Sequence, residues 1–376
     1  MRSNRFDKST TGFATVTLTV LLLAIIILVT LYTARFKAQE QRIMRNHLAM
    51  QEAMQVADAG LEQTIQMLDN DLSDLDLVIN GDIDGSPYTA TLSSVDYPGT
   101  PRGRVSIVNV NIVANSADGV ATQEVNQQLA VMSLLRGGPT VPLAIRGAST
   151  ASGSFEIVAN PNGGGEGVPL SIWSRDAITG SGNFTTCGQH EFALNDNCTS
   201  DSLSEAGDFG VDIFDNDPNF PDDLLDYLFG VPESQWESLR SQADEILDSC
   251  DSLGPNTTGF IWVTGECRIS SNTVVGSPDD PVILIVHNGD LRMNGGAEVY
   301  GMVFHFSPAD DPTFGTWDIS LNGTNSVFGA LVMSQSVDLS TGNFLVRYDG
   351  SITSQITTGD QFMRVYRVGG SWNDFM

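Results

Sequence analysis

The chain has 376 residues, of which 46 are acidic and 18 basic, giving a formal net charge of −28. Phosphate binding needs a basic surface, and a chain this acidic would repel a polyanion, so nucleic acid is excluded as an expected partner. The length is sufficient for two hydrophobic cores and predicts more than one module.

A nearly unbroken apolar run, FATVTLTVLLLAIIILVTLYTA, occupies residues 13–34. As a helix it would span about 33 Å, which is enough to cross a bilayer core. Basic residues both precede and follow it, so charge alone leaves its orientation open. A plain signal anchor or a secretory signal peptide is the alternative. A cleavable signal fits poorly, because its apolar region is normally shorter and ends at a small-x-small site.

The boundary before this run reads Lys8-Ser9-Thr10-Thr11-Gly12-Phe13. It resembles a class III prepilin leader, in which a short charged segment ends in Gly and a prepilin peptidase cuts before an aromatic residue. The resemblance implies cleavage between Gly12 and Phe13 on the cytoplasmic side, so that the helix remains as an inner-membrane anchor. It implies as partners the prepilin peptidase and other pilins, whose helices would pack with this one in a surface pilus.

The fifth residue after the implied cleavage is Thr17, where typical pilins carry Glu. In those relatives the carboxylate is thought to neutralise the N-terminal amine of a neighbouring subunit within an apolar filament core, where an unpaired charge is costly. The tip pseudopilin of type II secretion and many PilX-like proteins also lack this Glu. Thr17 therefore favours a minor, low-copy subunit at a filament tip.

The helix is expected to continue to about Asp69, because apolar residues recur near a 3.6-residue period at positions 44, 48, 54, 57, 61, 65 and 68. This stripe should pack under the head. The segment from Ala53 to Leu68 resembles the end of the PilX-type N-terminal domain, with Asp58 where Glu is usual. A solvated helix carboxylate is the simpler interpretation of Asp58. Leader, anchor and this segment together identify the chain as similar to PilX-like minor pilins.

Three β-like runs follow at residues 88–95, 103–114 and 120–135, with turns expected at Pro98-Gly99 and at residues 117–119. They predict a small antiparallel sheet on the helix. The expected organisation is a leader (1–12), a pilin helix (13–70, membrane part 13–34), a small β head (71–137) and a β-rich C-terminal domain (138–376). The expected fold class is thus α+β.

The C-terminal domain contains imperfect repeats of strand, corner and strand, with corners at Gly153, Gly182, Gly295, Gly323 and Gly342. Short strands that turn at Gly or Asn predict a β-solenoid, and a β-sandwich is the alternative. An acidic, partly helical insert at about 188–260 interrupts these repeats. Pro221 and Pro232 are placed to open helices within it.

All four cysteines lie in or beside this insert, which predicts two disulfides in an extracytoplasmic compartment. We expect Cys187 to pair with Cys198 and Cys250 with Cys267, because each pair is local and brackets one end of the insert. A zinc site is the alternative, but neither CxxC nor HxxxH spacing occurs.

No catalytic constellation can be assigned from the sequence, so no enzyme activity is expected. His287 and His305 lie in neighbouring repeats, where core or surface imidazoles are the expected role. Asp212, Asp215 and Asp217 lie in an acidic loop that could hold Ca²⁺, although the spacing does not match an EF-hand and a solvated loop is the alternative. No other cofactor is expected.

The expected function is that of a minor pilin that primes pilus assembly and displays an adhesive or partner-binding surface, such as a site for a tip adhesin. Two alternatives stay open. One is the tip pseudopilin of a type II secretion system, and the other is a membrane-anchored surface protein, including a surface enzyme for which no active-site residues can be named.

Overall fold

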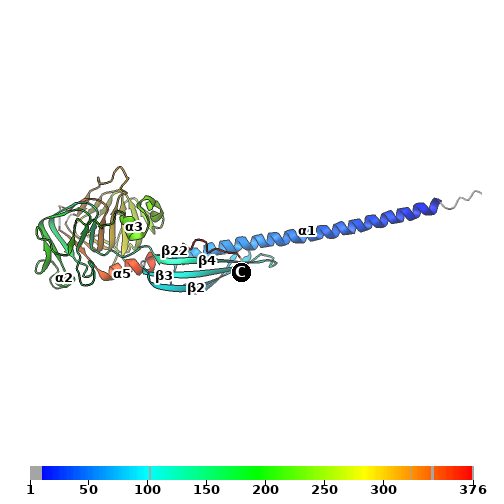
Figure 1. Cartoon of the computed structure of the whole chain (residues 1–376), viewed down its shortest axis with the longest axis horizontal. Coiled ribbons are helices and arrows are strands. Elements are labelled where there is room, and N and C mark those ends of the chain that lie inside the picture. Colours follow the sequence, from blue (N-terminus) through cyan, green and yellow to red (C-terminus); the bar gives the residue numbers. More distant parts are fainter. Residues whose placement is uncertain (1–10, 101–102, 322, 340–342, 375–376) are drawn as a thin grey trace, which may run out of the picture. The chain divides into compact units, whose positions relative to one another are not determined.

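A computed structural model describes residues 11–100, 103–321, 323–339 and 343–374 (Figure 1). The fold is α+β, with the long helix α1 (Thr11–Asn70) followed mostly by sheet. Two compact units divide the chain. The first comprises Met1–Ser94, Val108–Leu129 and Arg367–Met376, and the second comprises Val95–Ile107 and Ala130–Tyr366. In sequence, the larger unit thus lies between segments of the smaller one.

One sheet of the chain has the order β1-β2-β3-β4-β22. Its strands are β1 (Val78–Ile83), β2 (Ser86–Thr100), β3 (Gly103–Asn115), β4 (Thr122–Ser133) and β22 (Met363–Arg367). Strands β1 and β2 are antiparallel and meet at Asp84-Gly85, whose φ values of 52° and 87° are those of a tight hairpin turn. Because β2 runs through Pro98 and Gly99, the turn predicted there is wrong. Residues 101–102, between β2 and β3, lie outside the described residues.

The strands of the second unit are short. They are β5 (Leu143–Ile145), β6 (Ser149–Val158), β7 (Ile172–Ser174), β8 (Ile178–Cys187), β9 (Ser202–Glu205), β10 (Ile213–Phe214), β11 (Glu245–Leu247), β12 (Gly259–Thr264), β13 (Cys267–Ile269), β14 (Val274–Val275), β15 (Val282–His287), β16 (Leu291–Met293), β17 (Glu298–Phe306), β18 (Ile319–Leu321), β19 (Thr324–Met333), β20 (Val337–Leu339) and β21 (Asn343–Arg347). Its helices are α2 (Gln189–Asn195), α3 (Leu224–Phe229), η1 (Glu233–Gln235), α4 (Trp236–Arg240), α5 (Gly350–Thr358) and η2 (Asp360–Phe362).

The main sheet of the second unit has the order β11-β12-β15-β17-β19-β21-β6-β8-β9, and a smaller sheet has the order β13-β16-β18. Neighbouring strands are parallel and in register throughout, except that β9 runs antiparallel to β8. Strands β6 and β8 precede β12 in the chain, yet β6 pairs with β21 and β8 pairs with β6, at the far end of the sheet from β12. Residues 188–258 therefore carry the chain from one edge of the parallel stack to the other.

Two glycines allow long strands to bend. Strand β17 pairs with β14 before Gly301 and with β15 from Gly301 onward. Gly301 and Gly329 of β19 are in register, with φ values of 138° and 132°, and a β-carbon at Gly301 would collide with the carbonyl oxygen of Val282. The corners expected at Gly182 and Gly323 do have positive φ, but Gly296 rather than Gly295 takes this conformation and Gly153 does not. Gly342 lies outside the described residues.

The helices of residues 188–260 share a core with the main sheet. Leu225, Leu228 and Leu239 from α3 and α4 belong to the same buried cluster as Trp262 of β12 and Phe304 of β17. Every side chain of β15 is buried, as expected for a strand covered on both faces. The segment expected as an inserted subdomain is therefore packed into the second unit as part of its core.

Candidate functional site

The N-terminal half of α1 is an exposed apolar surface. Among the described residues, α1 is the one helix that is long and apolar enough to cross a membrane, and each side chain from Thr15 to Leu48 is exposed. Its threonine hydroxyls are satisfied within the helix, because those of Thr30 and Thr33 donate to the carbonyl oxygens of Ile26 and Val29 at 2.9 Å. In the hydrocarbon core of a bilayer, polar groups must find their hydrogen-bond partners within the protein, as these hydroxyls do. The helix thus fits a single-pass membrane anchor.

The residues predicted for processing and assembly lie at the start of this surface. Gly12 and Phe13 are in the first turn of α1, while residues 1–10 of the expected leader lie outside the described residues. Thr17 is exposed a little more than one turn further along, on the same apolar stretch.

The C-terminal half of α1 is buried along a line of small residues. Ala49, Ala53, Ala57 and Gly60 are buried at close to four-residue spacing, and the buried Thr64 hydroxyl donates to the Gly60 carbonyl at 2.7 Å. The predicted stripe was partly wrong, because Met44 and Leu48 are 70% and 60% exposed. Side chains without bulk let the helix backbone come close to the sheet. The buried face of this half of α1 is therefore the face that carries the alanines.

Polar contacts join this half of α1 to the rest of the first unit. The Glu52 carboxylate accepts hydrogen bonds from the Ser86 hydroxyl at 2.9 Å and from the Ala117 amide at 3.0 Å. Glu62 forms an ion pair with Arg367. Asp58 is exposed.

The two disulfides lie at opposite edges of the parallel stack. Cys187 bonds to Cys198 with a Cα–Cα distance of 5.1 Å, and Cys250 to Cys267 with 4.8 Å, which is the sequential pairing chosen from the sequence. Cys187 ends β8, beside the edge strand β9, whereas Cys250 follows the other edge strand, β11. Each disulfide therefore closes one end of the segment that returns the chain across the stack.

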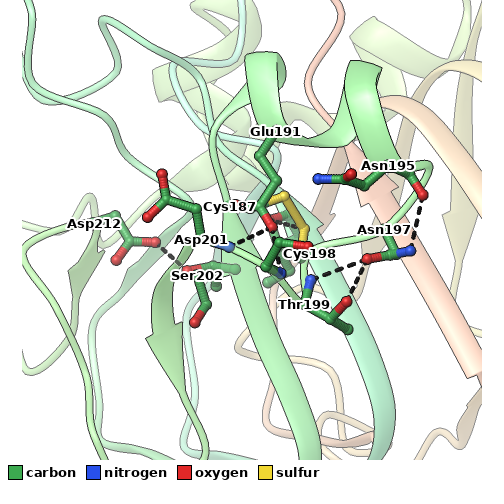
Figure 2. Close-up of a disulfide and its surroundings, with 12 residues drawn as sticks. Cys187, Glu191, Asn195, Asn197, Cys198, Thr199, Asp201, Ser202 and Asp212 are labelled. Carbon is green, nitrogen blue, oxygen red and sulfur yellow. Dashed lines mark hydrogen bonds between the residues drawn. A yellow bond between two sulfur atoms is a disulfide. The ribbon is translucent and has the colours of Figure 1, made fainter.

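The loop beside the first disulfide is held by further contacts, which Figure 2 shows. The buried Glu191 of α2 accepts hydrogen bonds from the amides of Ser200 and Asp201 at 2.7 and 2.6 Å. The Asn197 side-chain oxygen accepts from the amide of Thr199 at 3.1 Å. The loop is thus fixed at several points besides the disulfide.

The carboxylates considered for Ca²⁺ have other partners. Asp212 is buried and accepts from Thr186 at 2.6 Å, and Asp215 accepts from the amide of Ile178 at 3.2 Å. The Asp217 carboxylate accepts hydrogen bonds from the backbone amide of Asn219 and from the Trp173 indole. The hydrogen bond from the Asn219 amide holds the pKa of this carboxyl below its usual value. Across the described residues, no group of three or more His, Cys, Asp or Glu side chains is placed to hold a metal ion. These carboxylates fasten their loop to β7 and β8.

His287 occupies a buried aromatic environment that the sequence analysis did not anticipate. Its ring centroid lies 4.3 Å from that of Trp236, 5.4 Å from that of Trp262 and 5.5 Å from that of Phe306. Neither ring nitrogen has a hydrogen-bond partner among the described residues. Burial lowers the pKa of His287 to about 4, a shift that Asp311 opposes and that Arg240 and His305 reinforce. The imidazole is therefore neutral near pH 7.

Comparison with protein-family models, with curated proteins and with solved structures finds no match to this chain.

Proposed function

We propose that the protein is a minor pilin of a type IV pilus, which helps to prime pilus assembly and presents its second unit for adhesion or partner binding. The observation that carries this proposal is the division of α1. Its N-terminal half is exposed and apolar, and its C-terminal half is buried through small residues in a unit that contains an antiparallel sheet. A single helix can then serve as a membrane anchor and later pack among the helices of other subunits.

Processing follows from the Gly12–Phe13 boundary. A prepilin peptidase cuts there on the cytoplasmic side of the inner membrane, which removes the charged leader and leaves the apolar helix on the product. Glycine at the cleavage site lets an active site approach the backbone closely. The mature protein remains in the inner membrane until it joins a filament, with the rest of the chain on the extracytoplasmic side.

The two disulfides agree with the proposed extracytoplasmic location of the second unit. Both disulfides belong to a unit that would be exported, and disulfides persist in oxidising, extracytoplasmic surroundings. In the proposed role the second unit is a β-solenoid whose stacked parallel strands form a rigid display surface. The parallel in-register pairing of β12, β15, β17 and β19 supports this architecture over the β-sandwich alternative.

A processing experiment tests the proposal. Full-length protein would be expressed with its pilus machinery, and pili would be sheared from the cells and sequenced from the N-terminus. We expect assembled protein to begin at Phe13. The Gly12→Val variant should stay uncut in the membrane, whereas the Gly137→Val variant, which alters an exposed glycine with open space around it far from the cleavage site, should still be cut. Assembled protein that retains residue 1 would refute the proposal.

The subunit's position can be tested on the same filaments. Immunogold labelling should mark few sites at filament ends, because Thr17 lacks the carboxylate expected of a bulk shaft subunit. Labelling along the whole shaft would contradict the low-copy role.

A further inference from the structure

A polar groove of about 850 Å³ lies over the outer face of β8, β6, β21 and β19. Because these strands are parallel and in register, their outward side chains form rows that cross the strands. One row contains Asn183, Ser154, Asn343 and Thr324, one from each strand. Adjacent strands lie about 4.8 Å apart, so the row repeats polar groups at that interval.

The next row along the strands contains Thr185, Glu156, Leu345 and Ser326. Hydroxyl and amide groups such as those of Thr185 and Asn343 both donate and accept hydrogen bonds. The groove therefore offers hydrogen-bond donors and acceptors in both rows, interrupted by the apolar Leu345.

The floor and one wall of the groove are rigid. Beneath the floor, the buried Phe155 ring stacks between those of Phe184 and Phe344, with centroid distances of 6.1 and 5.3 Å. The wall that carries Asn197 and Thr199 is fixed by the disulfide and hydrogen bonds drawn in Figure 2. Little of the binding free energy would therefore be spent on ordering the protein around a ligand.

The charge of the groove restricts its ligand. Its charged lining groups are the carboxylates Glu156, Asp196 and Glu205, in a chain whose net charge is −28. Anionic ligands would be repelled. Phe155, Phe184 and Phe344 below the floor are buried, so the surface offered to a ligand combines hydroxyl, amide and carboxyl groups with a few apolar side chains such as Leu345. Such a lining suits an uncharged ligand rich in hydroxyl groups rather than an apolar one.

We propose that this groove binds a neutral oligosaccharide that lies across the strands, with about one sugar unit over each strand. A sugar chain presents hydroxyl groups at a regular interval, which matches the regular interval of the rows. The proposal goes beyond pilus membership and does not require it, because the groove belongs to the second unit whatever the anchor joins.

Binding would be measured by calorimetry on the full chain in phosphatidylcholine nanodiscs, since detergents with sugar headgroups would compete for the groove. The probes are cello-, malto-, xylo-, manno- and chito-oligosaccharides from monomer to hexamer. One series should bind with an affinity that rises up to about the tetramer and then levels off, because four strands form the floor.

Variants locate the site. Asn343→Ala and Glu156→Gln should each weaken binding roughly threefold to tenfold, as expected for loss of one or two hydrogen bonds. Asn256→Ala removes a similarly exposed amide outside the groove lining and should leave the affinity unchanged. The proposal is overturned if no neutral series binds, if a uronic-acid oligomer binds more tightly, or if both groove variants keep wild-type affinity. N-terminal processing, measured separately, is unaffected by any of these outcomes.

Discussion

Gly60 of α1 lies directly against the ring of Tyr88 in β2. A β-carbon added at Gly60 would come within 2.8 Å of Cδ2 of that ring, and the Tyr88 hydroxyl donates to the side-chain oxygen of Gln63 at 2.8 Å. Tyr88 is 4% exposed, and burial raises the pKa of its hydroxyl group. This contact sets how closely the helix can approach the strand.

The first prediction concerns this contact. In an isolated helix, Gly60→Ala would be stabilising by about 1 kcal/mol. Here the added methyl group must displace the Tyr88 ring, so we expect a loss of about 1–3 kcal/mol in the free energy of unfolding. Urea unfolding followed by circular dichroism measures it. In a Tyr88→Ala background the same change should become neutral or stabilising. A stabilising effect with Tyr88 present would contradict the close approach.

The second prediction concerns pH. The pKa of His287 is lowered to about 4 in the folded protein, whereas the unfolded chain binds a proton near pH 6.5. Between these values the unfolded state holds more protons, so stability should fall as the pH drops through this window. The loss amounts to about 3 kcal/mol and is complete below the folded pKa.

Two variants isolate this histidine. His287→Phe should retain stability near neutral pH and flatten the dependence between about pH 6.5 and pH 4, because an apolar ring replaces unpaired nitrogens. His190→Phe alters an exposed imidazole on α2 and should leave the dependence unchanged. Unfolding curves measured at several pH values provide the comparison. If His287→Phe and wild type lose the same stability on acidification, another group is responsible.

The third prediction concerns the disulfides. Replacing Cys187 and Cys198 together by Ser, or Cys250 and Cys267 together, should each lower stability by about 2–4 kcal/mol. Each replacement also frees an edge of the parallel sheet, and unprotected edges pair with other chains. Sedimentation velocity should therefore detect self-association in both double variants. Variants that remain monomeric and as stable as wild type would show that the edges are protected by other contacts.

The fourth prediction concerns Thr17 and rests on the proposed function. A subunit at a filament tip has no subunit above it to present an N-terminal amine, so a carboxylate there would have no partner. Thr17→Glu should consequently change incorporation little. Quantitative blotting of sheared filaments against whole cells measures incorporation for the variant and wild type. A several-fold rise in the variant would indicate a shaft subunit.

The sequence predicted the helix and the disulfides more successfully than the packing. Composition alone identifies the apolar run, and local cysteine spacing suggests the two pairs. The buried face of α1 was predicted only in part, because large apolar residues such as Met44 dominate the hydrophobic periodicity although they are exposed. Ala49 and Ala53 have little side chain of their own, and their burial depends on how near the sheet comes.

The groove could not have been predicted, because it depends on long-range pairing. Repeats that follow one another in the sequence are expected to stack in the same order. Here Ser154 pairs with Asn343 because the chain returns across the stack between β8 and β12. Strands β1 and β22 were missed for a related reason. Their short sequences carry weak signals, and pairing with neighbours determines that they form strands.

The C-terminal segment that belongs to the first unit begins at Arg367 and is hydrogen-bonded to β4. Reciprocal amide–carbonyl bonds of 2.8 and 2.9 Å join Asn126 to Asn373, and the amide of Val368 donates to Gln128 at 3.0 Å. During translation, this edge of β4 must wait until about 240 intervening residues have been synthesised. The unit that carries α1 thus starts first and closes last, and protection of the open edge of β4 becomes a requirement of biogenesis.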